Sequence, residues 1–233
     1  MLSDPQAKQL PEISNLDIAA YYQTAARAGG DYYDIFPLPD NLWGILIADV
    51  SGHGTPAAVL MAVTHSIVHS YPGPATAPGT LLGYVNQRLH DAYTTEVDAF
   101  VTAFYGSYDP INQILTYANA GHPQPRVKRC STGKLFELES EPALPLGIFR
   151  DVSFTNHKIQ LIPGDQLILY TDGITEAHNT TGNMYGIARL DAKLSNCGIS
   201  AQGLIDELME DLNAFSSDKH TEDDRTLLVI KVR

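Results

Sequence analysis

The sequence predicts an α+β fold in which antiparallel sheets carry helices on their outer faces. Segments rich in β-branched and aromatic residues, which favour strands, outnumber the segments with helical periodicity. Two such strands are separated only by an Asp-Pro turn, which is typical of a hairpin. Hairpins pair their strands antiparallel, so they favour this architecture over a parallel βαβ sheet.

The N-terminal part of the chain predicts three neighbouring strands and a helix. The strands cover 16–22, 31–38 and 41–50, and Gly or Pro-Asp-Asn punctuation separates them. Thr55 is placed to cap a helix that begins at Pro56. The residues that follow Pro56 are apolar on nearly every face, which predicts a buried helix.

The remaining elements follow from periodicity and turn signals. Residues 71–80 are a Pro/Gly-rich loop, and the helix after Thr80 ends before Asp98 with one apolar side, formed by Leu81, Leu82, Val85 and Leu89. The hairpin covers 99–121, and further strands are predicted at 152–161, 166–171 and 226–232. An amphipathic helix begins at Ser200, with its apolar side formed by Leu204, Ile205, Leu208, Met209 and Leu212.

Length and composition indicate one domain without a nucleic-acid or membrane partner. The 233 residues, 44% of them hydrophobic, suffice for one core. We assign 16–233 to it and read 1–15 as a lead-in, the remnant of a linker to an upstream domain. A net charge of −12 would repel nucleic acid and anionic lipid, and no run approaches the roughly 20 apolar residues of a membrane span.

Cys130 and Cys197 are the two cysteines of the chain. They are too few for a disulfide framework, and their spacing does not suit a zinc site. We therefore read both as thiols, which fits a reducing cytoplasm.

Aspartates recur at the ends of the predicted strands: Asp31, Asp34, Asp49, Asp172, Asp223 and Asp224. Any one of them could simply stabilise a turn. If these strand ends converge, however, the carboxylates would repel one another unless hard divalent cations neutralised them. Oxygen ligands without a cluster of Cys or His predict Mg²⁺ or Mn²⁺ rather than zinc.

The loop after Asp49 contains Gly52 and Gly54, which let the backbone approach a ligand, and it opens a helix whose N-terminus favours anions. It lacks the lysine of a nucleotide-binding phosphate loop. ATP hydrolysis through that motif is therefore disfavoured.

Six motifs together resemble the SpoIIE/RsbU branch of the metal-dependent, type 2C-like (PPM) protein serine/threonine phosphatases. They occur in the order and approximate spacing of that branch: GGDYYD, ADVSGHG, NAGHPQP, LPLGIF, LYTDGITEA and DDRTLLVIKV. The resemblance implies a four-layer α/β/β/α sandwich with two Mn²⁺ or Mg²⁺ ions, or three, at one end of the sheet pair. Two such ions activate water for attack on a phosphoryl group, so no protein nucleophile is needed.

The resemblance also assigns roles to individual residues. Asp49 would bridge two metals, the carbonyl of Val50 would complete one coordination sphere, and Asp172 and Asp223 would ligate on the other side. Asp31 would bind a metal directly or through water, and Asp224 would be a further metal ligand. Arg27 would bind the substrate phosphate. Asp34, His53 and Gly173 would lie around the metal ligands.

Several of these assignments have alternatives. Asp34 and Asp224 could only accept hydrogen bonds around the ligands, and Arg27 could be a plain surface residue. Eukaryotic relatives carry a histidine two residues after the bridging aspartate, where this chain has Ser51, so His53 could equally cap the helix or face solvent. His122 is read as stabilising its loop.

The expected function is dephosphorylation of phosphoserine or phosphothreonine on a protein partner. The resemblance suggests a STAS-type anti-sigma-factor antagonist as the partner, bacterial partner switching as the role, and an upstream sensor domain in a longer protein. Two alternatives remain open: a catalytically silent binding module of the same family, and a hydrolase of small phosphoesters.

Overall fold

The computed structural model describes residues 10–94, 99–216 and 221–233. They form two compact units that interleave along the chain. Unit 1 contains the residues up to Ala25, Pro123–Leu138 and Ile162–Arg233, and unit 2 contains Ala26–His122 and Glu139–Leu161. The lead-in proposed at 1–15 lies partly outside the described residues, and the single-domain assignment stays a prediction.

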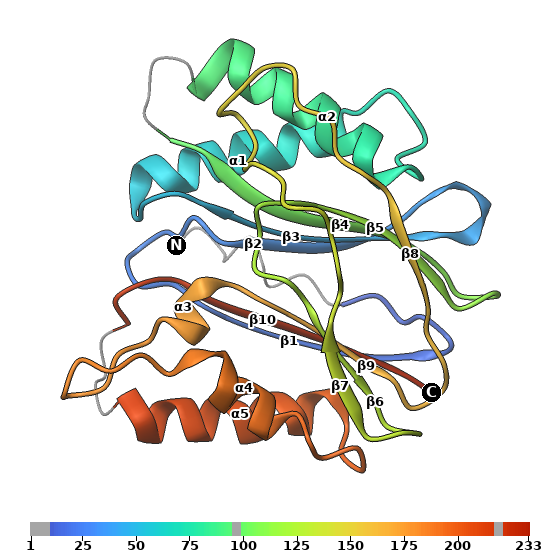
Figure 1. Cartoon of the computed structure of the whole chain (residues 1–233). Coiled ribbons are helices and arrows are strands. Elements are labelled where there is room, and N and C mark those ends of the chain that lie inside the picture. The colour runs from blue at the N-terminus through green and yellow to red at the C-terminus, as the bar shows by residue number, and fades with distance from the viewer. Residues whose placement is uncertain (1–9, 95–98, 217–220) are drawn as a thin grey trace. The chain divides into compact units, whose positions relative to one another are not determined.

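Unit 2 is built on a five-stranded antiparallel sheet with the order β2-β3-β4-β5-β8. Helices α1 and α2 lie on one face of this sheet (Figure 1). The elements are β2 (Tyr32–Pro37), β3 (Trp43–Val50), α1 (Thr55–His69), α2 (Pro78–Leu89), β4 (Val101–Asp109), β5 (Ile114–Ala120) and β8 (His157–Gln160), with a 3₁₀ turn η1 (Pro39–Asn41) and a π turn η2 (His90–Thr94).

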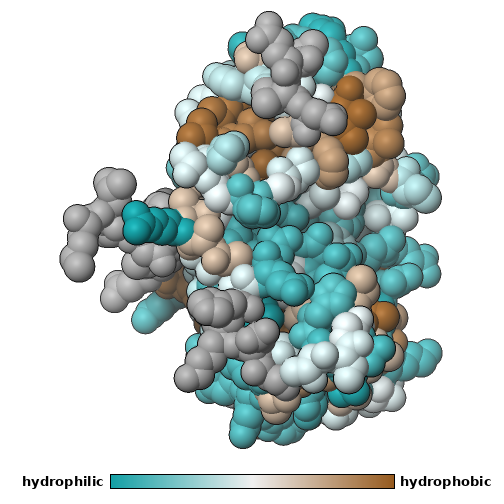
Figure 2. Space-filling view, turned by 90° about the vertical axis from the view of Figure 1, so that its left-hand side faces the viewer, coloured by the Kyte–Doolittle hydropathy of each residue, from teal (hydrophilic) through white to brown (hydrophobic). Residues whose placement is uncertain are grey.

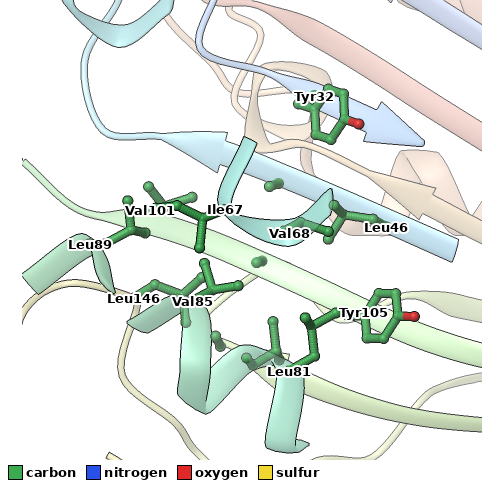
Figure 3. Close-up of a cluster of buried hydrophobic side chains, with 14 of the residues drawn as sticks. Tyr32, Leu46, Ile67, Val68, Leu81, Val85, Leu89, Val101, Tyr105 and Leu146 are labelled. Carbon is green, nitrogen blue, oxygen red and sulfur yellow. The ribbon is translucent and has the colours of Figure 1, made fainter. Parts of the chain in front are cut away.

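The core of unit 2 lies between this sheet and the two helices. Leu89 of α2 lies near Val101 of β4, and Leu81 of α2 lies near Tyr105 of β4 (Figure 3). Val68 of α1 lies near Leu46 of β3. The buried hydroxyl group of Tyr105 has a hydrogen-bond partner, because it donates to the carbonyl oxygen of Ala75 at 2.8 Å.

Unit 1 is built on a second five-stranded antiparallel sheet with the order β1-β10-β9-β6-β7, and α4 and α5 pack against it (Figure 1). Asp17 of β1 accepts the amide hydrogen of Ala201, and Ser200 accepts that of Gly203, so both side chains stabilise the first turn of α5. The elements are β1 (Leu16–Gln23), β6 (Arg126–Arg129), β7 (Lys134–Glu137), β9 (Gln166–Tyr170), α3 (Asp172–Thr175), α4 (Gly186–Lys193), α5 (Ala201–Ser216) and β10 (Arg225–Val232).

These two antiparallel sheets with flanking helices confirm the predicted fold class, and three local predictions need correction. Helix α1 begins at Thr55 with Gly54 as its N-cap, so Thr55 does not cap it. Nor is α1 buried all round, since Val59 is 59% exposed. The strand predicted at 152–161 shortens to β8, and β6, β7 and α4 were not predicted.

Cys130 and Cys197 form a disulfide across 67 residues of sequence. It joins the residue after β6 to the segment between α4 and α5, all within unit 1. The reading of both cysteines as thiols was therefore wrong. The prediction weighed only frameworks of several disulfides. Sequence spacing does not show that the two Cα atoms lie 5.8 Å apart, within the range of a disulfide.

No helix within the described parts of the chain has the length and apolarity needed to cross a membrane.

Candidate metal-binding active site

The first group of predicted site residues lies at one end of the sheet of unit 2. Strands β2 and β3 are antiparallel, with Tyr32 opposite Ala48. Asp31, immediately before β2, and Asp49, near the end of β3, therefore lie at the same end of the sheet. Asp31 is only 1% exposed, whereas Asp49 is partly exposed.

The backbone beside Asp49 is held against the GGD turn. The amide of Val50 donates to the carbonyl of Gly30 at 3.3 Å. A Cβ added to Gly30 would lie 3.0 Å from the carbonyl oxygen of Val50, so a larger residue would crowd the atom that the sequence analysis assigns to a metal. Gly30, the residue before Asp31, therefore allows the two backbone segments to pack closely.

The loop after Val50 turns sharply and leaves its histidine in solvent. Gly52 and Gly54 have φ angles of 88° and 78°, in the left-handed region that favours glycine. Ser51 is held by two hydrogen bonds to Phe100, one to its carbonyl and one from its amide. His53, between the glycines, is exposed, as in the solvent-facing alternative for this residue.

The second group lies at one end of the sheet of unit 1. Strands β9 and β10 are antiparallel, with Tyr170 opposite Leu227. Asp172, just after β9, and Asp223, just before β10, therefore share this end of the sheet. Two hydrogen bonds between the neighbouring Thr171 and Thr226 hold the segments together.

The electrostatics of this group favour a cation. Burial, the charge of Asp223 and then the charge of Glu176 raise the pKa of Asp172 above its ordinary value. Both leading causes disfavour a second negative charge at this place. A divalent cation with a preference for oxygen ligands would remove the conflict, so these carboxylates fit Mg²⁺ or Mn²⁺.

Asp224 and Gly173 shape this group from behind. Asp224 is buried and accepts the amide hydrogen of Ala25 at 2.8 Å through Oδ1, as expected if it only supports the ligands. A Cβ on Gly173 would lie 2.0 Å from the carbonyl oxygen of Asp224. Glycine is therefore required after Asp172 for the two segments to pack.

Each of the two segments that carry these aspartates also carries an arginine. Arg27, predicted to bind phosphate, is exposed in unit 2. Arg225, which was not predicted as a site residue, is 5% exposed and lines a cavity of about 380 Å³ in unit 1 together with Gly173 and Asp223. The signal was an arginine directly after two aspartates at the start of a buried strand.

Asp34 and His122 have other local partners. Oδ2 of Asp34 accepts hydrogen bonds from Tyr32 and His69, which lie on β2 and α1. His122 is buried, its backbone is hydrogen-bonded to the side chain of Asn119, and Nδ1 lies 3.0 Å from the hydroxyl of Thr102. His122 thus stabilises its loop, as expected.

Comparison with models of protein families shows to which family the chain belongs. The model of the family described as Stage II sporulation protein E (SpoIIE) matches residues 39–233. The chain belongs to the SpoIIE family. The match contains Asp49, Asp172 and Asp223, while Asp31 and Arg27 precede it.

Curated relatives of this SpoIIE-family chain include a named phosphatase. Protein IcfG of Synechocystis sp. is 28% identical over 95% of the chain, and the phosphoserine phosphatase RsbU of Bacillus subtilis is 28% identical over 96%. The chain spans 38% of IcfG and 65% of RsbU. It therefore corresponds to part of each of these proteins.

Solved structures share the fold over nearly the whole chain. The RsbU and RsbW domains of Rv1364c from Mycobacterium tuberculosis match with a TM-score of 0.77 and 29% identity, covering 96% of this chain and 62% of that one. The SiaA-PP2C domain of Pseudomonas aeruginosa matches with 0.78 and 21%, covering 93% and 86%. RsbX in complex with magnesium matches with 0.71 and 18%, covering 97% and 99%. The SpoIIE-family chain therefore has the fold of a PP2C-type domain.

Proposed function

We propose that this domain hydrolyses phosphoserine or phosphothreonine on a protein partner, with Mn²⁺ or Mg²⁺ ions held by aspartate carboxylates. The observation that carries the proposal is the pairing of Asp172 with Asp223, where burial and like charge raise the pKa of Asp172. A partly buried carboxylate whose ionisation is disfavoured by a neighbouring carboxylate fits a cation-binding site. The magnesium complex of RsbX gives the same kind of ion to a protein of the same fold.

The aspartates would bind the metal ions, and an arginine would bind the substrate. Asp49, Asp172 and Asp223 would be the main ligands, with the carbonyl of Val50, Asp31 and Asp224 completing or supporting the set. Two ions, when bound, supply an activated water and neutralise the phosphoryl oxygens. Arg27 would hold the substrate phosphate by charge-assisted hydrogen bonds.

A hollow next to Val50 favours a protein substrate over a free amino acid. It has a volume of about 400 Å³, and its lining includes Val59, Val63 and Tyr93, which are apolar or aromatic. Val59 and Tyr93 are 59% and 43% exposed. Hydrophobic surface is visible in the upper part of Figure 2, which faces the side where α1 begins. Free phosphoserine offers no apolar group for this hollow, whereas a protein partner does.

The partner we propose is a phosphorylated STAS-domain antagonist of an anti-sigma factor, in bacterial partner switching. RsbU and the RsbU–RsbW domains of Rv1364c are the similar proteins that support this role. An upstream sensor domain and a cytoplasmic location belong to the same proposal.

The test compares phosphate release from a phosphorylated STAS protein and from free phosphoserine at saturating Mn²⁺. We expect kcat/KM to be higher for the protein by orders of magnitude, because remote contacts contribute to transition-state binding. Val59→Asp should lower kcat/KM for the protein and spare p-nitrophenyl phosphate. Ile111→Asp is the matched control, since Ile111 is 78% exposed on the turn between β4 and β5.

Each other outcome favours one of the alternatives. Equal kcat/KM for the protein and for free phosphoserine would identify a hydrolase of small phosphoesters. Absence of release from both, and from p-nitrophenyl phosphate, would identify a silent binding module.

A further inference from the structure

Two histidines and an aspartate of unit 2 form a cluster that contains none of the proposed ligands of the catalytic ions. One carboxylate oxygen of Asp34 and one ring nitrogen each of His65 and His69 lie within 4.8 Å of one another. Within 10–94, 99–216 and 221–233, no other three His, Cys, Asp or Glu side chains were found in such an arrangement.

The cluster follows from the local sequence. His65 and His69 are four residues apart on α1 and therefore lie on the same side of the helix. Tyr32, Asp34 and Phe36 alternate along β2, so their side chains share the face of the sheet on which α1 packs. The rings of His65 and His69 are 4.4 Å apart between centroids, and the ring of Phe36 is 4.8 Å from that of His69.

Hydrogen bonds already orient these side chains toward one another. Tyr32 Oη lies 2.6 Å from both Asp34 Oδ2 and His65 Nδ1, and His69 Nε2 lies 2.8 Å from the same carboxylate oxygen. Tyr32 has one hydroxyl hydrogen. When Tyr32 donates it to Asp34, the hydrogen between Tyr32 and His65 belongs to Nδ1, and the lone pair of that imidazole is on Nε2.

The burial of Asp34 makes a compensating charge favourable. Asp34 is 8% exposed, in the middle of a strand face that is otherwise aromatic at Tyr32 and Phe36. A buried carboxylate is stable only with hydrogen bonds or a cation. The His69 side chain is 34% exposed, so an ion can enter from solvent without opening the core.

We propose that Asp34, His65 and His69 form a binding site for a divalent transition metal, with zinc as the ion that fits best. Two imidazoles and one carboxylate, with a fourth position open to water, are a ligand set that zinc uses, whereas Mg²⁺ prefers oxygen alone. Zinc bonds of about 2.0–2.2 Å place two ligands of one tetrahedral ion about 3.4 Å apart. Atoms that now lie within 4.8 Å would reach this spacing by small side-chain rotations.

Bound zinc would connect β2 to α1. Tyr32 would remain hydrogen-bonded to Asp34 and orient it, as partners behind metal ligands do. The same strand and helix flank Asp31 and the loop after Asp49. The ion would therefore stiffen the part of unit 2 that carries these carboxylates, and its binding does not depend on the proposed phosphatase activity.

The test is a titration of metal-stripped protein with Zn²⁺ in saturating Mg²⁺, which occupies the oxygen-ligand sites. We expect one Zn²⁺ per chain by calorimetry and a rise in Tm, because the ion binds only the folded state. Co²⁺ in place of Zn²⁺ should give the visible absorption of a four-coordinate site. His65→Gln and His69→Gln should each lower the affinity at least about tenfold, because loss of even a residue that supports a metal ligand costs that much.

His90→Gln is the matched control. His90 also lies beside a carboxylate, with Nδ1 3.5 Å from Asp91, but it belongs to no such trio within the described residues. It should bind Zn²⁺ like the unchanged protein. Circular dichroism checks the fold of each variant, and His69→Gln, at a partly exposed position, suffices if His65→Gln does not fold.

Two results would overturn the site. One is failure of the unchanged protein to take up Zn²⁺ in the presence of Mg²⁺, which would leave a purely hydrogen-bonded cluster. The other is unaltered Zn²⁺ affinity in His69→Gln, which would place the ion elsewhere.

Discussion

Gly173 shows how one missing side chain can hold together a group of charged residues. A Cβ at this position would lie 2.0 Å from the backbone oxygen of Asp224, which cannot move without displacing Asp223. We expect Gly173→Ala to cost about 1–3 kcal/mol of stability, the usual range for overpacking, and to weaken Mn²⁺ binding. Urea denaturation and calorimetric titration measure the two effects.

Gly198→Ala is the control for that substitution. The nearest atom to its added Cβ is the side-chain oxygen of Asn196 at 3.7 Å, an ordinary contact. Both measurements should be unchanged within error. A Gly173→Ala variant with normal stability and normal Mn²⁺ affinity would contradict the packing argument.

In the metal-free protein, Asp172 should lower the free energy of unfolding at neutral pH. Its pKa is raised by burial, Asp223 and Glu176, so the folded state holds the proton more tightly than the unfolded state. Its stabilising contribution is therefore present at low pH and lost as the pH rises from the ordinary value of an aspartate through the raised one. Metal binding has the opposite dependence, because a ligand must be ionised.

Asp172→Asn should consequently raise the Tm of the metal-free protein at neutral pH while it lowers Mn²⁺ affinity. Its stability should also fall less steeply between acid and neutral pH than that of the unchanged chain. Thermal melts in chelator across this range test both statements. A variant less stable than the parent at neutral pH would show that Asp172 serves packing rather than metal binding.

At the scale of elements, the disulfide anchors the end of strand β6. Cys130 follows β6, and the bond joins that strand to the segment before α5. Cys130→Ser with Cys197→Ser should destabilise the protein by about 2–4 kcal/mol, as loss of a bridge over a long loop does. Turnover of p-nitrophenyl phosphate at a temperature where the variant is folded should not change, because neither cysteine lies in a motif assigned to the site.

The measurement for the cysteine variant is a pair of urea curves, with and without reductant. Reductant should shift the curve of the unchanged protein toward that of the variant and leave the variant unaffected. A folded variant without turnover would contradict the assignment of catalysis to the aspartates.

The elements also show which parts of the fold can be read from sequence. Strands such as β3 and β10 are apolar along most of their length, and their ranges were predicted within two residues. Three of the four residues of β6 (RVKR) and two of the four of β7 (KLFE) are charged, so no hydrophobic alternation marks these strands. β6 is stabilised by tertiary contacts instead: Arg126 donates two hydrogen bonds to Asp191 of α4 at 2.6 and 2.8 Å.

Prediction of the site has the same limit. Motifs place Asp31 beside Asp49 and Asp172 beside Asp223 because strand pairing fixes which ends are neighbours. Roles that depend on side-chain contacts could not be read. Asp34 follows Asp31 by three residues, yet its contacts are with Tyr32 and His69, and no motif marks that histidine.

At the scale of the whole molecule, the proposed ligands are divided between two units. Asp49 belongs to unit 2 and Asp172 to unit 1. If both serve one binding event, Asp49→Asn and Asp172→Asn should each abolish most Mn²⁺ binding and turnover, and the double variant should lose little more. Calorimetry and phosphate release on the four proteins give the two coupling energies. Strictly additive losses would show that the carboxylates act separately.

The order of strands in unit 1 has a consequence for biosynthesis. β1, the first strand in the described sequence, pairs in this sheet only with β10, the last. Every strand of unit 2 lies between Tyr32 and Gln160, so a ribosome completes all of that sheet before it reaches β10. Until β10 is synthesised, β1 therefore lacks its partner, and its amides and the apolar side chains that it later buries, such as Leu16 and Ala19, stay uncovered. An exposed strand edge of this kind favours aggregation, so the binding of a chaperone would protect the nascent chain until β10 emerges.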